Sequence, residues 1–385
     1  MKEQQRKILT ETGFGLTAAG KIFFLSLAAC VCLSMNVYFA LVTTVVCAAA
    51  SVSLNKKILS PSAFLLVPVI FVAGTVGKSG LPLAILVGAA LYLLISLSPK
   101  ALDSSPSVKV GAAIGLAFSV TALLTTYYFG IGATGAYTLE MLKNYRYLGF
   151  HPNWRGVFYG TITLFAMITY PFKFKKLSKV LPAEFVSVLI PLVLNLFLNP
   201  NGETTPILEV GALSDMKVLS GVKTFLPIID FSALGESENL INVLKGAFAL
   251  AVVFAIFKPL QKKNSVVSAS ASGVSSLLGA LPATESEITV YTPVSAVTAL
   301  AAATVFAVFC PAVIARVPLH SLAVVFIVSA WKAVPFGSVS PVFKKRNFFE
   351  IVSFFVAALS FVFVDAFTAA IVCVLISVAF RRVSK

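Results

Sequence analysis

The sequence predicts an all-α membrane protein with about 14 transmembrane segments, and three observations lead to this prediction. Hydrophobic residues make up 58% of the 385 positions and the mean hydropathy is +0.95, whereas soluble domains are roughly 45–50% apolar. The apolar residues form helix-length runs, unlike the alternating ~10-residue strands of a membrane barrel. Short basic clusters separate these runs, as in the cytoplasmic loops of membrane proteins.

The apolar segments lie at about 16–33, 36–54, 61–76, 81–97, 108–129, 156–172, 182–198, 240–260, 266–280, 283–292, 294–314, 317–334, 348–363 and 366–381. If both termini are cytoplasmic, every second loop is cytoplasmic. The basic clusters Lys2–Lys7, Lys56–Lys57, Lys173–Lys179, Lys262–Lys263, Lys344–Arg346 and Arg381–Lys385 then fall on the cytoplasmic side, while the acidic loop at 199–239 lies outside. We therefore expect a multi-pass protein of the plasma (inner) membrane with both termini in the cytoplasm.

The chain divides into two repeats of seven segments. The first repeat covers 1–198, an extracytoplasmic connecting loop covers 199–239, and the second repeat covers 240–385, with no soluble domain expected after it. The third segment of each repeat is too short to cross a ~30 Å hydrocarbon core, which takes about twenty residues. We interpret both as half-helices, because short, Pro-interrupted segments at matching positions of two halves indicate a transport site.

Both half-helices begin with a helix breaker among hydroxyl residues, at Leu59–Ala63 and at Leu281–Thr284. Proline is favoured in the first turn of a helix, so free N–H groups and positive dipole ends would point toward a shared cavity that suits an anion. The alternative is plain capping at helix bends. The candidate substrate-binding residues at these two breaks are Ser60, Ser62, Ala63, Ala283, Thr284, Glu285 and Ser286.

Lys258 near the end of the eighth segment completes the candidate site, because ionisable groups inside membrane segments are expensive and are functional hypotheses by default. The alternative is that its ammonium group snorkels to the interface, and Lys21 in the first segment poses the same choice. Glu285 and Glu287 suit the positive end of a helix but would repel an anion. Either they face away from the site or the substrate is not a simple anion.

The remaining polar residues give no sign of a reaction. Asp365 precedes the last segment and is expected to cap it. The five cysteines lie in apolar runs without metal-ligand or redox spacing, and the sequence has no Gly-rich phosphate loop or catalytic triad. We therefore expect no enzyme activity, metal or cofactor. Topology accounts for the net charge of +15, so nucleic acid is not an expected partner.

Several stretches occur in the order in which they stand in a known family. Leu278–Thr284 is similar to a Gly-Gly-hydrophobic-Pro-Ala/Val-Thr-Gly motif, Val317–Val325 to an Ile-Pro-Leu-Ala-Ala-Leu-Ala run, and Phe363–Ile371 to a Phe-Val-Asp-Leu-Thr-x-Ala-Ile stretch. The chain thereby resembles the membrane part of the sulfate permease (SulP) family of anion transporters. The resemblance implies a seven-plus-seven inverted repeat in which a core domain, segments one to four and eight to eleven, moves against a gate domain. It also implies a homodimer in the lipid bilayer that carries sulfate, bicarbonate, chloride or a related small inorganic anion.

The chain departs from this family at positions that matter for transport. Phe24-Leu25 replaces a Pro-Gln pair, Lys258 stands where an acid is usual on the eighth helix, and Glu285 replaces a glycine. The resemblance covers the membrane part only, and we do not expect the cytoplasmic STAS domain that usually follows it. Two alternatives stay open: a transporter of nucleobases or other organic solutes with the same fold, and a degenerate member that does not transport.

Overall fold

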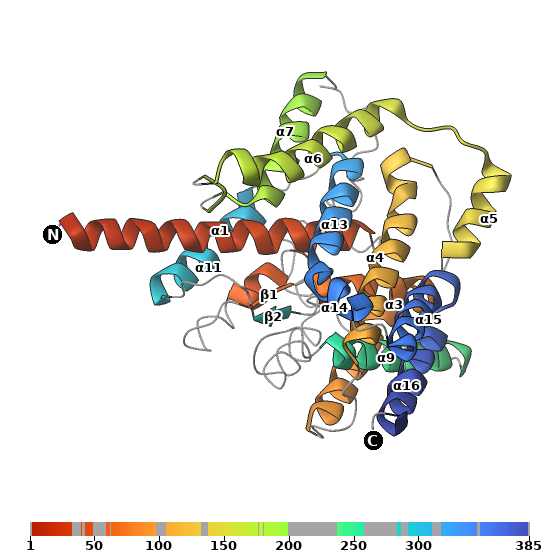
Figure 1. Ribbon diagram of the computed structural model, residues 1–385. Helices are drawn as coiled ribbons and strands as arrows, with labels where there is room; N and C mark the ends of the chain where they lie inside the picture. The colour runs from red at the N-terminus through yellow and green to blue at the C-terminus, as the bar shows by residue number, and fades with distance from the viewer. Residues whose placement is uncertain are drawn as a thin grey trace.

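The computed structural model describes residues 2–32, 40, 43–48, 59–61, 63–97, 105–131, 138–175, 177–179, 181–198, 237–257, 283–285, 292–309, 317–344 and 347–383. The described elements, shown in Figure 1, are α1 (Lys2–Cys32), β1 (Leu59–Pro61), α3 (Ala63–Leu97), α4 (Pro106–Phe129), α5 (Thr138–Leu148), α6 (Trp154–Lys173), η1 (Leu177–Lys179), α7 (Ala183–Leu198), α9 (Ser237–Phe257), β2 (Ala283–Glu285), α11 (Pro293–Phe309), α13 (Leu319–Ala333), η5 (Phe336–Ser338), α14 (Val339–Lys344), α15 (Phe348–Phe363) and α16 (Ala366–Val383).

The described elements are helices, as predicted, apart from the two three-residue strands. Among the described residues, four stretches are long and apolar enough to cross a membrane: Ile8–Ala29, Pro106–Phe129, Asn239–Phe257 and Leu319–Lys344. Several shorter apolar helices accompany them, so the protein is an integral membrane protein. Helix α1 begins at Lys2, well before the predicted start at residue 16, because Lys, Glu and Gln in its first turns are good helix formers.

Helices at matching positions of the two repeats make matching contacts. By position in the repeats, α4 corresponds to α13, α6 to α15, α1 to α9, and α3 to α11. The α4–α15 contact then matches the α13–α6 contact, and the α9–α3 contact matches the α1–α11 contact. Likewise α7 packs on α6 as α16 packs on α15. Two repeats with the same fold require this pattern, and Figure 1 shows the α3–α9 and α4–α15 pairs side by side.

Small residues hold the α4–α15 pair close together. A Cβ atom on Gly111 would meet the carbonyl oxygen of Phe354, and one on Gly115 would meet that of Ala358. One turn further on, the Ser119 hydroxyl donates to the carbonyl of Phe361 at 2.6 Å. The two helices therefore run in the same direction, and small residues let their backbones approach.

The α6–α13 pair is built in the same way. The imidazole of His320, fully buried, lies against Gly156, and Val324 lies against Gly160. These contacts also make the two helices run in the same direction. The fourteen-segment prediction requires these directions, since α4 and α15 would be its fifth and thirteenth segments and α6 and α13 its sixth and twelfth.

Helix α3 corrects the prediction of two separate segments at 61–76 and 81–97, because it is continuous from Ala63 to Leu97. It does, however, bend. A Cβ on Gly246 of α9 would meet both Val76 and Ala84, which a straight helix would separate by about 12 Å. Pro82 lies at this bend, and proline cannot donate the hydrogen bond that keeps a helix straight. Both arms of α3 therefore pack on α9.

A polar cap begins the last helix as predicted. The Asp365 carboxylate accepts hydrogen bonds from the backbone N–H groups of Phe367 at 3.0 Å and Thr368 at 3.1 Å. Its other oxygen accepts from the Thr368 hydroxyl at 2.7 Å. The carboxylate thus satisfies donors that have no partner within the helix.

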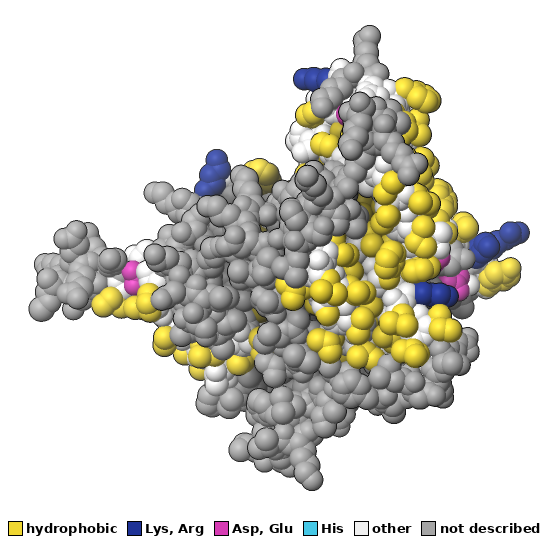
Figure 2. All heavy atoms as spheres, turned by 90° about the horizontal axis from the view of Figure 1, so that it is seen from below, with side chains coloured by type: hydrophobic (Ala, Val, Ile, Leu, Met, Phe, Trp, Pro, Cys, Tyr) yellow, Lys and Arg dark blue, Asp and Glu magenta, His cyan; other side chains and the backbone are white. Residues whose placement is uncertain are grey.

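The outer surface is apolar over large areas. Exposed Phe, Leu, Ile and Val side chains cover the outward faces of α6, α7, α15 and α16. Figure 2 shows apolar side chains spread over the described part of one face, with charged side chains near its margins. Contiguous apolar surface of this extent is what a protein presents to lipid.

The tight α4–α15 contact gives a stability prediction. We expect Gly115→Ala to destabilise the fold by about 1–3 kcal/mol, because the added methyl group has no space and overpacked contacts cost about that much. Gly337→Ala is the matched control, since a Cβ there meets no atom within 4 Å. Thermal unfolding of the purified protein in detergent measures both variants, and equal melting midpoints would contradict the packing.

Candidate anion-binding site

The two predicted breaks meet in a two-stranded antiparallel pair. β1 pairs with β2 so that Ser60 lies opposite Thr284, Leu59 opposite Glu285, and Pro61 opposite Ala283. More than two hundred residues separate these strands in the sequence. Figure 1 shows them beside α1, on the side away from α6 and α7, and α1 packs against β1. The chain therefore brings together both positions at which sequence analysis expected a half-helix to begin.

The register of this pair is centred on the two hydroxyl residues, since Leu59 and Pro61 lie opposite Glu285 and Ala283 on either side of them. The first strand belongs to one predicted repeat and the second strand to the other. The helix contacts show a matching exchange of the two repeats. The strand pair thus lies where the two repeats meet.

The structure corrects the local conformation of several candidate residues. Ser60 and Pro61 lie in β1 and not in the first turn of a helix, and Ala283, Thr284 and Glu285 lie in β2. The extended backbone pairs with the other repeat, a partner that no local pattern can reveal. Ala63 begins α3, so the first N–H groups of this helix have no partner within it. Ser62, Lys258 and Ser286 lie outside the described residues.

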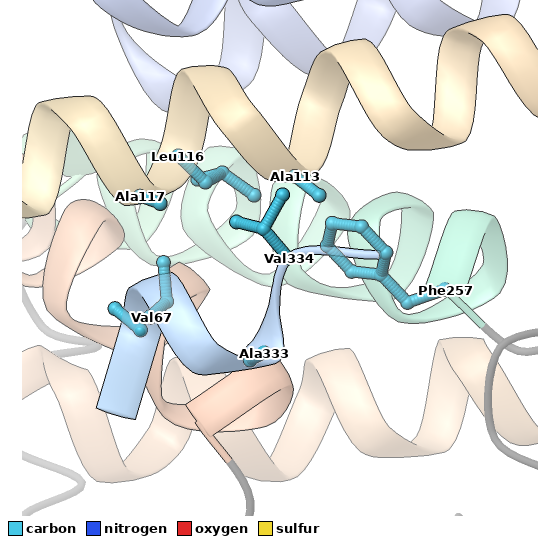
Figure 3. A pocket seen from close by; sticks show the side chains of 8 residues that line it. Val67, Ala113, Leu116, Ala117, Phe257, Ala333 and Val334 are labelled. Carbon is cyan, nitrogen blue, oxygen red and sulfur yellow. The ribbon is translucent and has the colours of Figure 1, made fainter. Parts of the chain in front are cut away.

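An apolar cavity of about 10 Å³ lies close to the start of α3. Figure 3 shows Val67 of α3 and Phe257 at the end of α9 facing Ala113, Leu116 and Ala117 of α4, with Ala333 and Val334 at the end of α13. The volume is that of one water molecule at most, and a water needs polar partners. This cavity lies between α3 and α9 on one side and α4 and α13 on the other, and it does not have the room or the polar groups to hold an anion.

A second charged cluster, which the sequence pattern did not predict, contains Lys21 together with Lys332 and Glu184. The Lys332 ammonium, near the end of α13, lies 3.4 Å from the carbonyl oxygen of Met167. It is attracted by the Glu184 carboxylate in the first turn of α7 and repelled by Lys21 of α1. Lys332 lies within the predicted apolar segment 317–334. An ionisable residue inside a membrane segment is a sign of a functional or paired charge, and this sign could have predicted the cluster.

The Lys21 cluster lies where α1 meets the beginning of α7. A Cβ atom on Gly20 would lie 3.7 Å from the Cγ of Pro182. The rings of Phe24 and Phe185 meet edge to face, with their centroids 5.3 Å apart. Lys21 therefore belongs to one charged cluster with Lys332 of α13 and Glu184 of α7.

Comparison with known proteins identifies the fold. Neither a protein-family model nor a curated protein sequence matches the chain. The transmembrane domain of BicA, a cyanobacterial bicarbonate transporter, is similar with a TM-score of 0.71 at 15% identity, over 94% of this chain and 97% of that domain. The murine anion transporter Slc26a9 in its inward-facing state is similar with a TM-score of 0.73 at 11% identity, over 97% of this chain and 68% of that one.

The chain has the fold of these transporters. A further structure of SLC26A9 agrees, with a TM-score of 0.68 at 11% identity, over 98% of this chain and 66% of that one. The chain spans about two thirds of the length of the SLC26A9 chains and nearly all of the BicA domain. The resemblance to the sulfate permease family, found on short motifs, is thereby confirmed for the fold.

The strand pair makes a cross-linking prediction. In a background whose five native cysteines are replaced by alanine, Ser60→Cys with Thr284→Cys should form a disulfide under mild oxidation. Directly opposed residues in an antiparallel pair have Cα atoms about 4.5–5.5 Å apart, within the range that a disulfide spans. A protease site placed in the 199–239 loop would report the bond, because cleaved fragments stay linked on a non-reducing gel.

The matched control is Ser60→Cys with Glu285→Cys. These residues are offset by one position, and successive side chains of a strand point to opposite faces, so we expect far less linkage. Equal linkage in both pairs, or none in either, would contradict the register.

Proposed function

We propose that the protein is a secondary transporter or exchanger of small inorganic anions, of the bicarbonate, sulfate or chloride class. The observation that carries this proposal is the β1–β2 pair, which joins the two breaks in a fold that known anion transporters share. In transporters, the ends of broken helices hold the substrate near the bilayer midplane. Such an end offers a positive dipole and free N–H groups, which favour an anion.

The proposed binding residues have distinct roles. The backbone N–H groups at Ala63 and Ala283 would donate to the anion, and the hydroxyls of Ser60, Ser62, Thr284 and Ser286 would add further donors. Lys258 would supply a full positive charge. It follows Phe257, the buried last residue of α9, which faces Val67 of α3 across the apolar cavity. Lys258 would also offset the Glu285 carboxylate.

The proposed mechanism moves a core against a gate. The core would contain α1, α3, α9, β1, β2 and α11, and the gate α4, α6, α7, α13, α15 and α16. The apolar cavity lies where these two groups of helices meet, with α3 and α9 on one side and α4 and α13 on the other. Alanine and valine side chains without hydrogen bonds let such surfaces slide. We further propose a homodimer with cytoplasmic termini.

One residue favours a second candidate function. Glu285 lies in β2, at the proposed site, and a carboxylate there repels anions while it can accept hydrogen bonds from a nucleobase. Uptake of labelled bicarbonate, sulfate, chloride and uracil into proteoliposomes separates the candidates. We expect uptake of at least one anion and none of uracil. Uracil uptake alone would favour the organic-solute transporter, and no uptake of any of the four would favour a non-transporting protein.

Lys258 provides a sharper test of anion binding. Loss of a charge-assisted hydrogen bond costs about 1.5–3 kcal/mol, which is roughly 10- to 150-fold in affinity. We expect Lys258→Gln to raise the KM for the anion by this factor in proteoliposomes at matched expression. Lys262→Gln is the control, since this residue stands in the predicted loop. Small and equal effects in both variants would assign Lys258 to the interface and leave anion binding to the main chain.

A further inference from the structure

Helix α5 and the chain that follows it, up to the first turn of α6, carry an exposed surface with both aromatic and basic character. Its aromatic side chains are Tyr147, Phe150 and Trp154, which are 84%, 57% and 70% exposed. Its basic side chains are the exposed residues Lys143, Arg146 and Arg155. We call these six residues the α5 surface. Three large aromatic side chains so exposed in one segment indicate a partner that covers them.

Helix α5 is amphipathic, and its opposite face explains how it is held. Thr138 and Met141 are buried, and Tyr145 is half-buried, at the spacing of one helix face. This face packs against α4 and α15. Lys143, Arg146 and Tyr147 follow the other face, so the described protein does not cover them.

The α5 surface has a fixed position at one end of the helix bundle. The backbone N–H of Asn153 donates to the carbonyl of Phe129, the last residue of α4, at 2.8 Å. The Phe150 ring meets the Phe129 ring edge to face at 5.1 Å. Trp154 is the first residue of α6. The surface therefore lies where two apolar helices end and begin. The stretch Pro106–Phe129 is long and apolar enough to cross a membrane, so its end at Phe129 is expected near the membrane–water interface.

The charge of this surface selects an anionic partner. Between residues 138 and 155 the sequence contains three basic residues and one acidic residue, Glu140, so this segment carries a net positive charge. The helices packed against α5 carry their charges at the far end, with Lys109 in the first turn of α4 and Glu350 in that of α15. Asp365, just beyond α15, is engaged in capping α16.

We infer that the α5 surface binds the phosphate headgroups of anionic phospholipids, with α5 lying in the plane of the interface. Tyrosine and tryptophan are enriched at the level of the headgroups. Amphipathic helices with Lys and Arg lie in that plane and are attracted to anionic lipid. Each basic residue near an anionic surface strengthens binding by about fivefold. This inference rests on the membrane location alone and holds whatever the protein transports.

Trp154 is a natural reporter, because the chain has only one other tryptophan. The full-length protein is placed in liposomes of phosphatidylcholine that contain, at equal mole fraction, either brominated phosphatidylglycerol or brominated phosphatidylcholine. Bromine quenches tryptophan fluorescence on contact. The Trp154 signal is the difference between the native protein and Trp154→Phe, so Trp331, which donates to the Thr121 hydroxyl, stays in place.

We expect brominated phosphatidylglycerol to quench Trp154 at least about twofold more than brominated phosphatidylcholine, given the fivefold preference for each basic residue. In the triple variant Lys143→Gln, Arg146→Gln, Arg155→Gln the two lipids should quench equally. The control triple variant Lys173→Gln, Lys175→Gln, Lys344→Gln neutralises exposed lysines elsewhere and should keep the native preference.

Three results would overturn the inference. Equal quenching of the native protein by both lipids would remove the anionic preference, and equal loss of preference in both triple variants would make it a general effect of net charge. Absence of quenching by either lipid would place Trp154 away from the bilayer. In that case, Trp154 emission that shifts with the ratio of protein to lipid would identify a second copy of the chain as the partner.

Discussion

Backbone N–H and C=O groups at membrane depth must find partners within the protein, because lipid offers none. The β1–β2 pair meets this constraint where each repeat loses its helical hydrogen bonds. Each strand is the partner that the other lacks, so neither repeat satisfies this backbone alone. The symmetric register around Ser60 and Thr284 fixes how the repeats face each other. The helix pairs α4–α15 and α13–α6, and likewise α9–α3 and α1–α11, show the same exchange of the two repeats.

Two kinds of helix contact surround this pair. Within α4–α15 the backbones approach closely at Gly111 and Gly115, and the buried Ser119 hydroxyl donates a hydrogen bond across the contact. Between α3–α9 and α4–α13 the contact is made by alanine, valine, leucine and phenylalanine around a small cavity. Under the proposed mechanism, the first kind keeps the core and the gate intact while the second lets them slide. An anion bound at the strand pair then travels with the core.

Local sequence signals predicted the local features. The helical class, the position of both breaks and the cap at Asp365 depend on composition, on proline and on short-range capping, and all three are found. Long-range features were not predictable in this way. Three contacts join residues that are far apart in the sequence. They are the pairing of Ser60 with Thr284, the packing of both arms of the bent helix α3 on Gly246 of α9, and the attraction between Lys332 and Glu184. Such contacts depend on how the whole chain folds, so short sequence patterns do not reveal them.

The most direct measurement of an anion site at the strand pair is substrate protection of one thiol. Thr284→Cys, in a background without the native cysteines, is alkylated in proteoliposomes with a neutral thiol reagent at increasing concentrations of the transported anion. An anion held at the strand pair predicts that alkylation slows, with half-maximal protection near the KM for transport. An alkylation rate that stays constant at anion concentrations that saturate transport would contradict the account.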